Sequence, residues 1–296
     1  MRIGVDMGGT KIEAVALDES GRPLLRRRVP TPRDDYGATL GAIAGLVREL
    51  ELAVGEPGTV GVGIPGALSP ATGLVKNSNA TWIVGRPLDR DLAARLGRPV
   101  RLANDANCFA LSEATDGAGR GAVVVFGVIL GTGCGGGVVV RGQVLTGRNA
   151  IAGEWGHNPL PWAGEGEWPG PPCHCGRRGC VEGFVSGTGL ERDFREATGE
   201  AAGAREIVAR AAAGDGAAEG AVGRLEDRLA RALAAVVNLL DPDVIVLGGG
   251  LSNVARLYET VPGLWARWIF SDRVDTPLLP PVHGDASGAR GAAWLW

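Results

Sequence analysis

A unit made of a strand, a glycine turn and a second strand occurs twice in this sequence, and this duplication constrains the fold more than any other feature. The first copy is IGVDMGGTKIEAVALDESG at residues 3–21, and the second is GVILGTGCGGGVVVRGQ at residues 127–143. In each copy an apolar strand runs into a Gly-Thr turn, and another apolar strand follows. Repetition at a spacing of roughly 125 residues predicts two related lobes facing a cleft.

The first part of the chain alternates apolar strands with helical segments, which is typical of an α/β lobe. Apolar residues recur at helical spacing over residues 37–53. A later strand, PVRLAND at residues 99–105, runs into a helix that we predict from Cys108 to Ala114.

The second part of the chain contains a long amphipathic helix at residues 218–240, which Asp241-Pro242 ends, and a strand with a glycine turn at residues 243–250. We therefore expect an α/β protein with two lobes. They are a small N-terminal lobe of residues 1–118, a larger lobe of residues 119–286 with an irregular loop at 149–185, and a C-terminal helix at 287–296 that packs back onto the first lobe.

The composition excludes several classes of protein. The net charge is -3, so the chain lacks the basic surface that nucleic-acid binding requires, and we expect no nucleic-acid partner. Asp6 interrupts the N-terminal segment before the apolar run of about 7 residues that a signal peptide needs. No stretch approaches the ~18 apolar residues of a membrane span. We expect a cytoplasmic protein without a membrane partner, where five cysteines argue against a disulfide framework.

Three glycine turns follow three apolar strands, at Gly8-Gly9-Thr10, Gly131-Thr132-Gly133 and Gly248-Gly249-Gly250. Successive backbone N–H groups in such turns form sites for anions, and the two threonines add hydroxyl groups. None of the turns has the spacing of a P-loop, and the first leads into a strand rather than the helix of a dinucleotide fold. Either the turns bind phosphate, or they are hairpins in a chain with 49 glycines.

Two aspartates follow strands and could serve phosphoryl transfer. Asp6 precedes the first glycine turn, where a carboxylate can orient Mg2+ or its water shell, unless it is simply a solvated carboxylate at a strand end. Asn104-Asp105 ends a strand and begins a helix. Asp105 can orient the attacking hydroxyl and accept its proton. The alternative role for Asp105 is that of an N-cap, which would not exclude catalysis.

A cluster of cysteines indicates a metal site. Cys173, His174, Cys175 and Cys180 place three thiols and an imidazole within eight residues, and His157 lies upstream. Four nitrogen and sulfur ligands suit tetrahedral Zn2+, whereas C-x-C spacing is awkward for a disulfide. We expect His157 as the fourth ligand because His174 is cramped between two others. Protein then fills every position and the zinc is structural. The alternative is a set of inert thiols.

Two glutamates flank this cluster. Glu154 lies three residues before His157, and Glu182 lies two residues after Cys180. A metal would hold both carboxylates in one place, where they can accept hydrogen bonds from sugar hydroxyls. The alternative is that both are surface charges.

These motifs together resemble the ROK family of bacterial sugar kinases. The resemblance covers essentially the whole chain and rests on IGVDMGGTK, IPG, NDAN, LGTGCGGG, GEWGHNPL and C-x-C-G-x-x-G-C-x-E. It is closest to fructokinases of the manno(fructo)kinase type, on RVPTPRDDY, VKNSNATW, RLANDANC and GARGAAWLW. It implies the duplicated, ribonuclease H-like fold of actin and hexokinase, with two lobes and a central cleft.

The resemblance also implies roles for individual residues. Asp105 would be the general base on the sugar hydroxymethyl group. The sugar contacts would be Asn79, Asn104, Glu154, His157 and Glu182. The contacts to ATP would be Gly4, Asp6, Gly8, Gly9, Thr10, Lys11, Gly131, Thr132, Gly133, Cys134, Gly135, Gly136, Gly248, Gly249 and Gly250. The zinc ligands would be His157, Cys173, Cys175 and Cys180.

The implied reaction is phosphate transfer from ATP, with Mg2+, to D-fructose, giving fructose 6-phosphate. Kinases of mannose, glucose and N-acetylglucosamine share every motif, so the hexose stays open. ROK repressors need a helix-turn-helix domain of roughly 60–80 residues before the first turn. Five residues precede Asp6 here, so we expect a kinase. The resemblance suggests a homodimer. The chain departs from the family pattern at His174 and in the acidic Trp-Pro stretch between His157 and Cys173.

Overall fold

The computed structural model describes residues 1–296, apart from the side chain of Asp285. It divides into two compact units, each built from more than one segment of the chain. Unit 1 comprises Met1–Gly121, Gly137–Gly153 and Val282–Trp296, and unit 2 comprises Ala122–Gly136 and Glu154–Pro281. The sequence predicts the first boundary after residue 118; in the structure the chain leaves unit 1 after Gly121, and residues 137–153 belong to unit 1.

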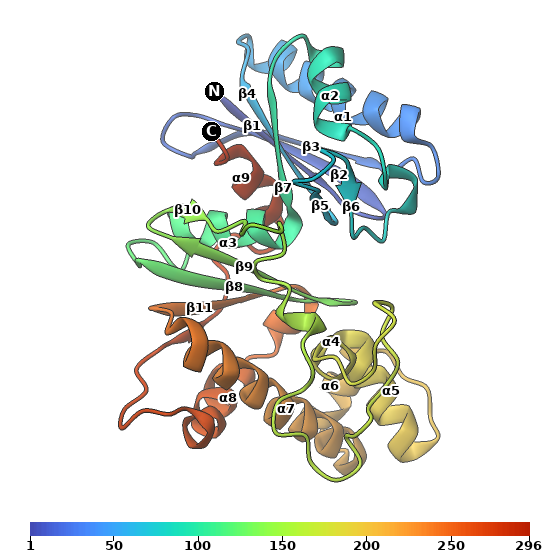
Figure 1. Cartoon of the computed structure of the whole chain (residues 1–296), viewed down its shortest axis with the longest axis vertical. Coiled ribbons are helices and arrows are strands. Elements are labelled where there is room, and N and C mark those ends of the chain that lie inside the picture. Colours follow the sequence, from blue (N-terminus) through green and yellow to red (C-terminus); the bar gives the residue numbers. More distant parts are fainter. The chain divides into compact units, whose positions relative to one another are not determined.

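Unit 1 is built on a five-stranded sheet with the order β3-β2-β1-β4-β7 (Figure 1). Strand β1 pairs antiparallel with β2 and parallel with β4, and β4 pairs parallel with β7. Its elements are β1 (Arg2–Met7), β2 (Lys11–Leu17), β3 (Pro23–Pro30), α1 (Tyr36–Val54), β4 (Thr59–Ile64), β5 (Ala67–Leu68), β6 (Val75–Lys76), η1 (Thr81–Ile83), α2 (Leu88–Leu96), β7 (Val100–Asn104), α3 (Asp105–Asp116), β10 (Gln143–Val144), η5 (Gly284–Ala286) and α9 (Ser287–Ala293).

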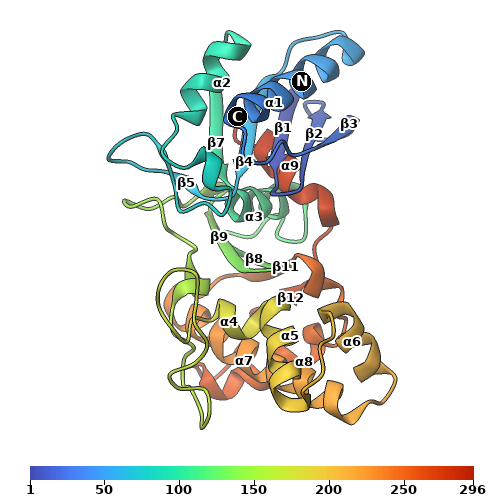
Figure 2. The ribbon, with the colours of Figure 1, turned by 90° about the vertical axis from the view of Figure 1, so that its right-hand side faces the viewer.

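The two faces of β1 have different neighbours because side chains alternate along a strand. Ile3, Val5 and Met7 are fully buried in an apolar cluster that includes the inner side of α1. Gly4 and Asp6 lie on the opposite face, which α9 covers (Figure 2). The last helix of the chain therefore covers the face of the sheet that carries Asp6.

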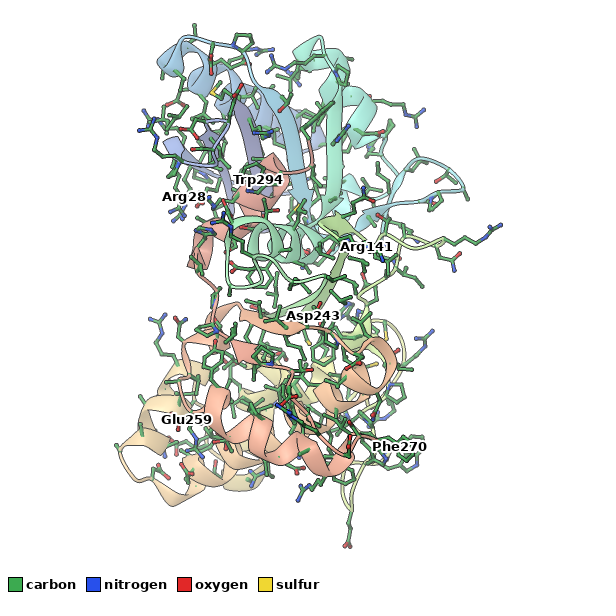
Figure 3. All side chains as sticks on the ribbon, turned by 90° about the vertical axis from the view of Figure 1, so that its left-hand side faces the viewer. Arg28, Arg141, Asp243, Glu259, Phe270 and Trp294 are labelled. Atoms are coloured by element: carbon green, nitrogen blue, oxygen red, sulfur yellow. The ribbon has the colours of Figure 1, made fainter. Side chains whose placement is uncertain are left out.

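Helix α9 approaches the sheet so closely that β1 and β4 have no room for a side chain at Gly4 and Gly61. A Cβ atom at Gly4 would lie 1.8 Å from the carbonyl oxygen of Ala289, and one at Gly61 would lie 1.8 Å from that of Ala292. Trp294, labelled in Figure 3, extends the contact beyond the end of the helix. Only glycine permits this approach, so packing explains both glycines.

A buried carboxylate on α3 holds the segments by which the chain leaves and re-enters unit 1. Glu113 accepts hydrogen bonds from Ala118 N at 3.0 Å, Val282 N at 3.1 Å and Ser287 Oγ at 2.8 Å. Its side chain is fully buried. These bonds compensate the cost of burying the carboxylate and fix the start of α9 to α3.

The second sheet has the order β10-β9-β8-β11-β12. Strand β11 pairs parallel with both β8 and β12. The remaining elements are β8 (Val124–Leu130), β9 (Cys134–Val140), η2 (Trp155–His157), α4 (Glu182–Val185), α5 (Gly187–Thr198), α6 (Ala204–Ala212), α7 (Gly216–Leu240), β11 (Val244–Gly248), η3 (Gly250–Asn253), α8 (Leu257–Trp265), η4 (Ala266–Trp268) and β12 (Leu278–Leu279). The boundary between the units falls within β9, after Gly136.

The two sheets share one connectivity. Numbered in chain order within each sheet, β1, β2, β3, β4 and β7 lie as 3-2-1-4-5, and so do β8 to β12. Strands β5 and β6 form a separate hairpin. The duplication and the α/β class predicted from the sequence are confirmed.

The long helix α7 organises the helical part of unit 2. It packs against α5, α6 and α8 (Figure 2). Its inner side carries Leu225, Leu229 and Leu233, which are buried as their helical spacing predicts. Of the helices in the described part of the chain, none combines the length and apolar character needed to cross a bilayer.

We expect Gly61→Ala to lower the free energy of unfolding by about 2–3 kcal/mol, because the new Cβ atom must displace the backbone of α9. The control is Gly45→Ala in α1, where an added Cβ atom meets nothing within 4 Å. This substitution should leave stability unchanged or raise it by up to about 1 kcal/mol. Urea denaturation of both variants measures the difference. Equal stabilities would show that α9 can shift without cost.

Candidate functional site

The first glycine turn connects β1 to β2 and is held by the segment that follows β3. The carbonyl oxygen of Gly8 accepts a hydrogen bond from Thr31 Oγ1 at 2.7 Å, and that of Gly9 accepts one from Arg33 Nε at 2.7 Å. The carbonyl oxygen of Thr10 accepts one from Thr31 N at 3.0 Å. Three consecutive carbonyl groups of the turn are therefore fixed in direction.

These bonds also fix the direction of the neighbouring N–H groups. In a trans peptide the N–H group points opposite to the carbonyl group of the preceding residue. Because residues 31–33 hold the carbonyl groups of Gly8 and Gly9, the N–H groups of Gly9 and Thr10 point away from that segment. Gly9 and Thr10 are exposed. The turn therefore presents adjacent backbone donors to solvent, an arrangement that suits an anion.

Asp6 lies at the end of β1, next to this turn. Burial, followed by the charges of Asp105 and Glu13, raises the pKa of Asp6 to about 7, against the opposing effect of Lys11. A cation beside Asp6 would offset both the burial and the repulsion between carboxylates. The residues present therefore fit the Mg2+ that the sequence predicts.

Asn104 ends β7 and caps α3. Its Oδ1 accepts hydrogen bonds from the N–H groups of Ala106 at 2.9 Å and Asn107 at 3.3 Å. Asp105 is the first residue of the helix, and its Oδ1 accepts a bond from Ala106 N at 2.8 Å. The alternative role of Asp105 as the N-cap is therefore wrong. The predicted helix start at Cys108 is also wrong, because the Asn104 cap allows α3 to begin three residues earlier.

Three further residues of unit 1 are predicted to contact the sugar or ATP, and each has its own surroundings in the structure. Gly4 is buried beneath α9, so its lack of a side chain has a packing explanation. Asn79 is exposed in the loop between β6 and η1. Lys11 is half-buried at the start of β2, where its charge lowers the pKa of Asp6.

The second glycine turn connects β8 to β9, and its carbonyl groups are held in the same manner. The carbonyl oxygen of Gly131 accepts a bond from Gly187 N at 2.8 Å, and that of Thr132 accepts one from Thr188 Oγ1 at 2.8 Å. Both donors lie at the start of α5. The N–H groups of Thr132 and Gly133 therefore point away from α5. Each copy of the duplicated unit thus fixes turn carbonyls on one side and leaves N–H groups on the other.

Glu182, at the start of α4, connects the second turn to the cysteine cluster. Its Oε2 accepts a hydrogen bond from Cys134 N at 3.0 Å. Its Oε1 lies 3.1 Å from His174 Nδ1 and 3.8 Å from Cys173 Sγ. A Cβ atom at Gly133 would lie 2.6 Å from Oε2, so the glycine makes room for this carboxylate. One carboxylate therefore contacts two of the predicted functional segments.

The predicted nucleotide contacts Cys134, Gly135 and Gly136 lie inside β9. The carbonyl oxygen of Gly135 accepts a hydrogen bond from Trp155 Nε1 at 3.0 Å. Burial and the charge of Glu182 raise the pKa of the Cys134 thiol well above its ordinary value, so this thiol stays protonated.

The third glycine turn follows β11. Gly248 ends the strand, and Gly249 and Gly250 are exposed. The carbonyl oxygen of Gly249 accepts hydrogen bonds from Ser252 N at 3.1 Å and Ser252 Oγ at 2.7 Å. The peptide between the two exposed glycines is thus fixed by the following 3-10 helix η3.

The cysteine cluster has the geometry of a tetrahedral metal site. The ligand atoms of His157, Cys173, Cys175 and Cys180 all lie within 4.8 Å of one another. Cys173 Sγ is 3.5 Å from His157 Nδ1, and Cys175 Sγ is 3.6 Å from Cys180 Sγ. Usual zinc bond lengths give separations of roughly 3.6 Å for nitrogen and sulfur and roughly 3.8 Å for two sulfurs. The four residues therefore fit Zn2+.

The backbone between the cysteines turns tightly to bring the thiols together. Cys173 N donates to the carbonyl oxygen of Arg177 at 2.8 Å, and Gly176 N donates to that of Cys173 at 3.0 Å. Gly176 has a φ of 85°, in the left-handed region that favours glycine. Burial raises the pKa of Cys180 to about 12. A bound cation would favour the thiolate instead.

The two histidines of this region have different partners. His174 is 70 % exposed, and its Nδ1 faces Glu182 rather than a thiol. A second possible ligand set, His157 with His174 and Glu182, also brings its ligand atoms together. That set offers no thiolate and would recruit the carboxylate that holds the second glycine turn. The cysteine set therefore fits zinc better.

Glu154 lies beside the ring nitrogen of His157 that does not face the cysteines. Its Oε2 is 4.0 Å from His157 Nε2, while Nδ1 faces Cys173. A metal on Nδ1 would fix the ring and so the position of Nε2 near Glu154.

Sequence reasoning missed the residues that hold the turns. Thr31, Arg33 and Thr188 donate to turn carbonyls, and Glu113 holds the start of α9. Thr31 and Arg33 lie within RVPTPRDDY, which resembles the family pattern but has no feature that marks them as contacts of a glycine turn. Thr188 lies in the Gly-Ser-rich segment VSGTG, which has no periodic signal. No local pattern identifies which distant turn such residues contact.

Comparison with known proteins identifies the class. The model of the ROK family matches residues 2–296. Two relatives are named N-acetyl-D-glucosamine kinase. The one from Yersinia pseudotuberculosis is 41% identical over 303 residues, covering 100% of this chain and 98% of the relative. The one from Photobacterium profundum is 43% identical over 299 residues, covering 100% and 99%.

Two solved structures have the same fold. The ROK hexokinase from Thermus thermophilus has a TM-score of 0.88 and 35% identity, covering 99% of this chain and 96% of that one. The ROK family glucokinase from Streptomyces griseus, in complex with glucose and AMPPNP, has a TM-score of 0.81 and 30% identity, covering 99% and 98%. The chain therefore belongs to the ROK family. Within that family it is a sugar kinase, as the sequence predicts.

We expect the purified protein to contain one zinc ion per chain. His157→Ala should lose the metal because it removes one of four ligands, whereas His174→Ala should retain it. Elemental analysis after gel filtration measures both. Zinc loss from the His174 variant alone would show that His174, rather than His157, is the fourth ligand. Zinc-free wild-type protein would refute the zinc site.

Proposed function

We propose that this chain is an N-acetyl-D-glucosamine kinase, which transfers the terminal phosphate of ATP to the hydroxymethyl group of the sugar. The observation that carries this choice is the shared name of relatives that are 41% and 43% identical along the whole chain. The alignments cover 100% of this chain and 98% and 99% of the two relatives, so the likeness extends over the whole chain.

Other hexoses are weaker candidates. The fructose preference expected from the sequence motifs has no support among these relatives. Glucose is the second candidate because the two structures with 35% and 30% identity are named hexokinase and glucokinase. Hexoses share the reacting hydroxymethyl group, so we expect glucose to be phosphorylated with lower efficiency.

Asp105 is proposed as the general base. Phosphoryl transfer requires a group that orients the attacking hydroxyl and accepts its proton, and little other covalent chemistry from the protein. The Asn104 cap and the bond from Ala106 N hold Asp105 at the start of α3. A carboxylate fixed in this way can hold the sugar hydroxyl in one orientation.

The glycine turns are proposed to bind the phosphates of ATP. The N–H groups of Gly9, Thr10, Thr132 and Gly133 are directed by their held carbonyl groups, so they need no rearrangement to receive an anion. Mg2+, when bound, would neutralise phosphate charge. Asp6 would hold it or its water shell.

The cysteine cluster is proposed to hold structural zinc and to position sugar contacts. His157 presents Nδ1 to Cys173 and Nε2 to Glu154. Glu182 follows the last cysteine and contacts the second glycine turn. Zinc would fix the side chains of His157, Glu154 and Glu182 in position. Its four protein ligands would leave no open coordination position for substrate. Asn79 and Asn104 are proposed as further sugar contacts.

A panel of sugars tests the substrate. We expect kcat/KM for N-acetyl-D-glucosamine to exceed that for glucose, mannose and fructose by a factor of about 10 or more, since an acetamido group adds hydrogen bonds that the other sugars cannot make. A coupled assay of ADP release measures each value under the same conditions. A higher kcat/KM for fructose would restore the expectation from the sequence motifs.

Asp105→Asn tests the base. We expect kcat to fall by a factor of about 10²–10⁴, with sugar affinity by calorimetry nearly unchanged, because the amide keeps the shape but cannot accept the proton. The control is Asp35→Asn at the N-cap of α1, where Asn caps as well as Asp. Turnover close to wild type in the Asp105 variant would exclude the assignment.

A further inference from the structure

The segment between His157 and Cys173 contains the acidic Trp-Pro stretch that departs from the family pattern. The 3-10 helix η2 (Trp155–His157) ends where this segment begins, and residues 158–172 contain no helix or strand. Backbone hydrogen bonds hold its two ends: Leu160 N donates to the carbonyl oxygen of Gly179, and Gly179 N donates to that of Pro171. The middle of the segment, residues 161–170, lies outside these bonds and would ordinarily be mobile. In this chain, one of its acidic residues is anchored to helix α7.

The carboxylate of Glu167 accepts hydrogen bonds from two arginines of α7 and from one backbone N–H group. Arg231 Nη2 and Arg228 Nε both donate to its Oε1 at 2.8 Å. Arg231 Nη1 donates to its Oε2 at 2.8 Å, and so does Gly164 N. The fork of Arg231 thus binds both carboxylate oxygens, which is the strongest geometry for this pair.

The same guanidinium group also holds the backbone of the segment. Arg231 Nη1 donates to the carbonyl oxygen of Trp162 at 2.9 Å and to that of Pro161 at 3.3 Å. The side chain of Arg231 is 3% exposed and that of Glu167 is 11% exposed. Water therefore has little access to the hydrogen bonds between these two side chains. The pair is more strongly shielded from solvent than an ordinary surface ion pair.

The arginines around Glu167 also bind two aspartates, one on α5 and one on α7. Arg228 Nη1 donates to Asp193 Oδ1 at 2.6 Å, and Arg224 donates to Asp193 Oδ2 at 2.7 Å. Asp227 accepts from Arg231 Nε at 2.9 Å. Burial would raise the pKa of Glu167, but bonds from Arg231 and Arg228 outweigh it and hold the pKa at about 2. Glu167 therefore keeps its charge throughout the physiological pH range.

We propose that Glu167 is a positioning residue, which holds the segment between His157 and Cys173 on α7 whether or not a metal is bound and thereby slows metal loss. The part that concerns metal loss rests on the proposed zinc site, and the part that concerns the anchored segment does not. Glu167 lies between the histidine and the first cysteine in sequence. Its anchor therefore shortens the free chain that must be ordered for the four ligands to meet.

The chain offers a matched control within the same segment. Glu165 and Glu167 are separated by one residue, but Glu165 is exposed whereas Glu167 is enclosed by two arginines. Glu167→Gln removes the charge opposite two nearly buried guanidinium groups, and Glu165→Gln removes a charge at the surface. Any effect of altered net charge is the same in both variants.

Hydrogen–deuterium exchange of residues 159–172 in the full chain tests the anchor. In metal-free wild-type protein, prepared with a chelator, we expect this segment to exchange slowly. Glu167→Gln should accelerate exchange by at least about 10-fold, and Glu165→Gln should match wild type. Exchange at the unprotected rate in metal-free wild type would overturn the proposal, even if the Glu167 variant fails to fold. Equal rates in the two variants would also overturn it.

Zinc release to a chelating dye, and steady-state kinetics, complete the test. We expect release from Glu167→Gln to be at least about 10-fold faster than from Glu165→Gln, because the ligand-bearing segment detaches. The KM for sugar should rise while the KM for ATP is unchanged, whereas a general loss of folded protein would move neither. Wild-type protein with a slowly exchanging segment but no zinc would support the anchor and refute the zinc site. Equal release rates would refute the role in metal retention.

Discussion

The first and second glycine turns depend on hydrogen bonds to their carbonyl groups for the direction of their N–H groups. Glycine gives a chain the freedom to approach a ligand closely, but the same freedom leaves the N–H groups undirected. The structure removes that freedom by binding the carbonyl of each neighbouring peptide. Thr31 and Arg33 do this for the first turn, and Gly187 and Thr188 do it for the second. The two copies of the duplicated unit therefore fix their turn carbonyl groups in the same way, but the donors come from unrelated segments.

In unit 2 these contacts belong to a continuous chain of interactions. The start of α5 holds the second glycine turn, and Asp193 of the same helix binds arginines of α7. One of those arginines, Arg228, also binds Glu167, which precedes the cysteine cluster. Glu182 returns from the cluster to the turn through Cys134 N. A change at any one of these contacts is therefore expected to reach the others through packed and charged groups, rather than remain local.

The parts of the fold that follow local periodicity could be predicted from the sequence. Alternation and helical spacing predict the duplicated strands, α1 and α7, and the cysteine spacing predicts the three thiols that the structure brings together. Helices α5 and α6 are not predicted, because each carries only two large apolar residues, Leu190 and Phe194 in α5 and Ile207 and Val208 in α6. Two residues are too few to show an apolar period. The family resemblance assigns Gly4 to the nucleotide, but its packing beneath α9 explains why the residue is glycine. Its neighbour Ala289 lies at the opposite end of the chain, and no local pattern predicts that contact.

The same long-range packing explains the chemistry of Asp6. A Cβ atom at Gly288, in the first turn of α9, would lie 2.8 Å from Asp6 Oδ2, so the C-terminal helix covers this carboxylate directly. Burial is the main reason that the pKa of Asp6 is about 7, and the charge of Asp105 adds to it. Glu113 in turn fixes the start of α9 to α3, the helix that begins with Asp105. Helix α9, which buries Asp6, is thus held by α3, which begins with Asp105. The ionisation of Asp6 therefore depends on how firmly α9 is packed.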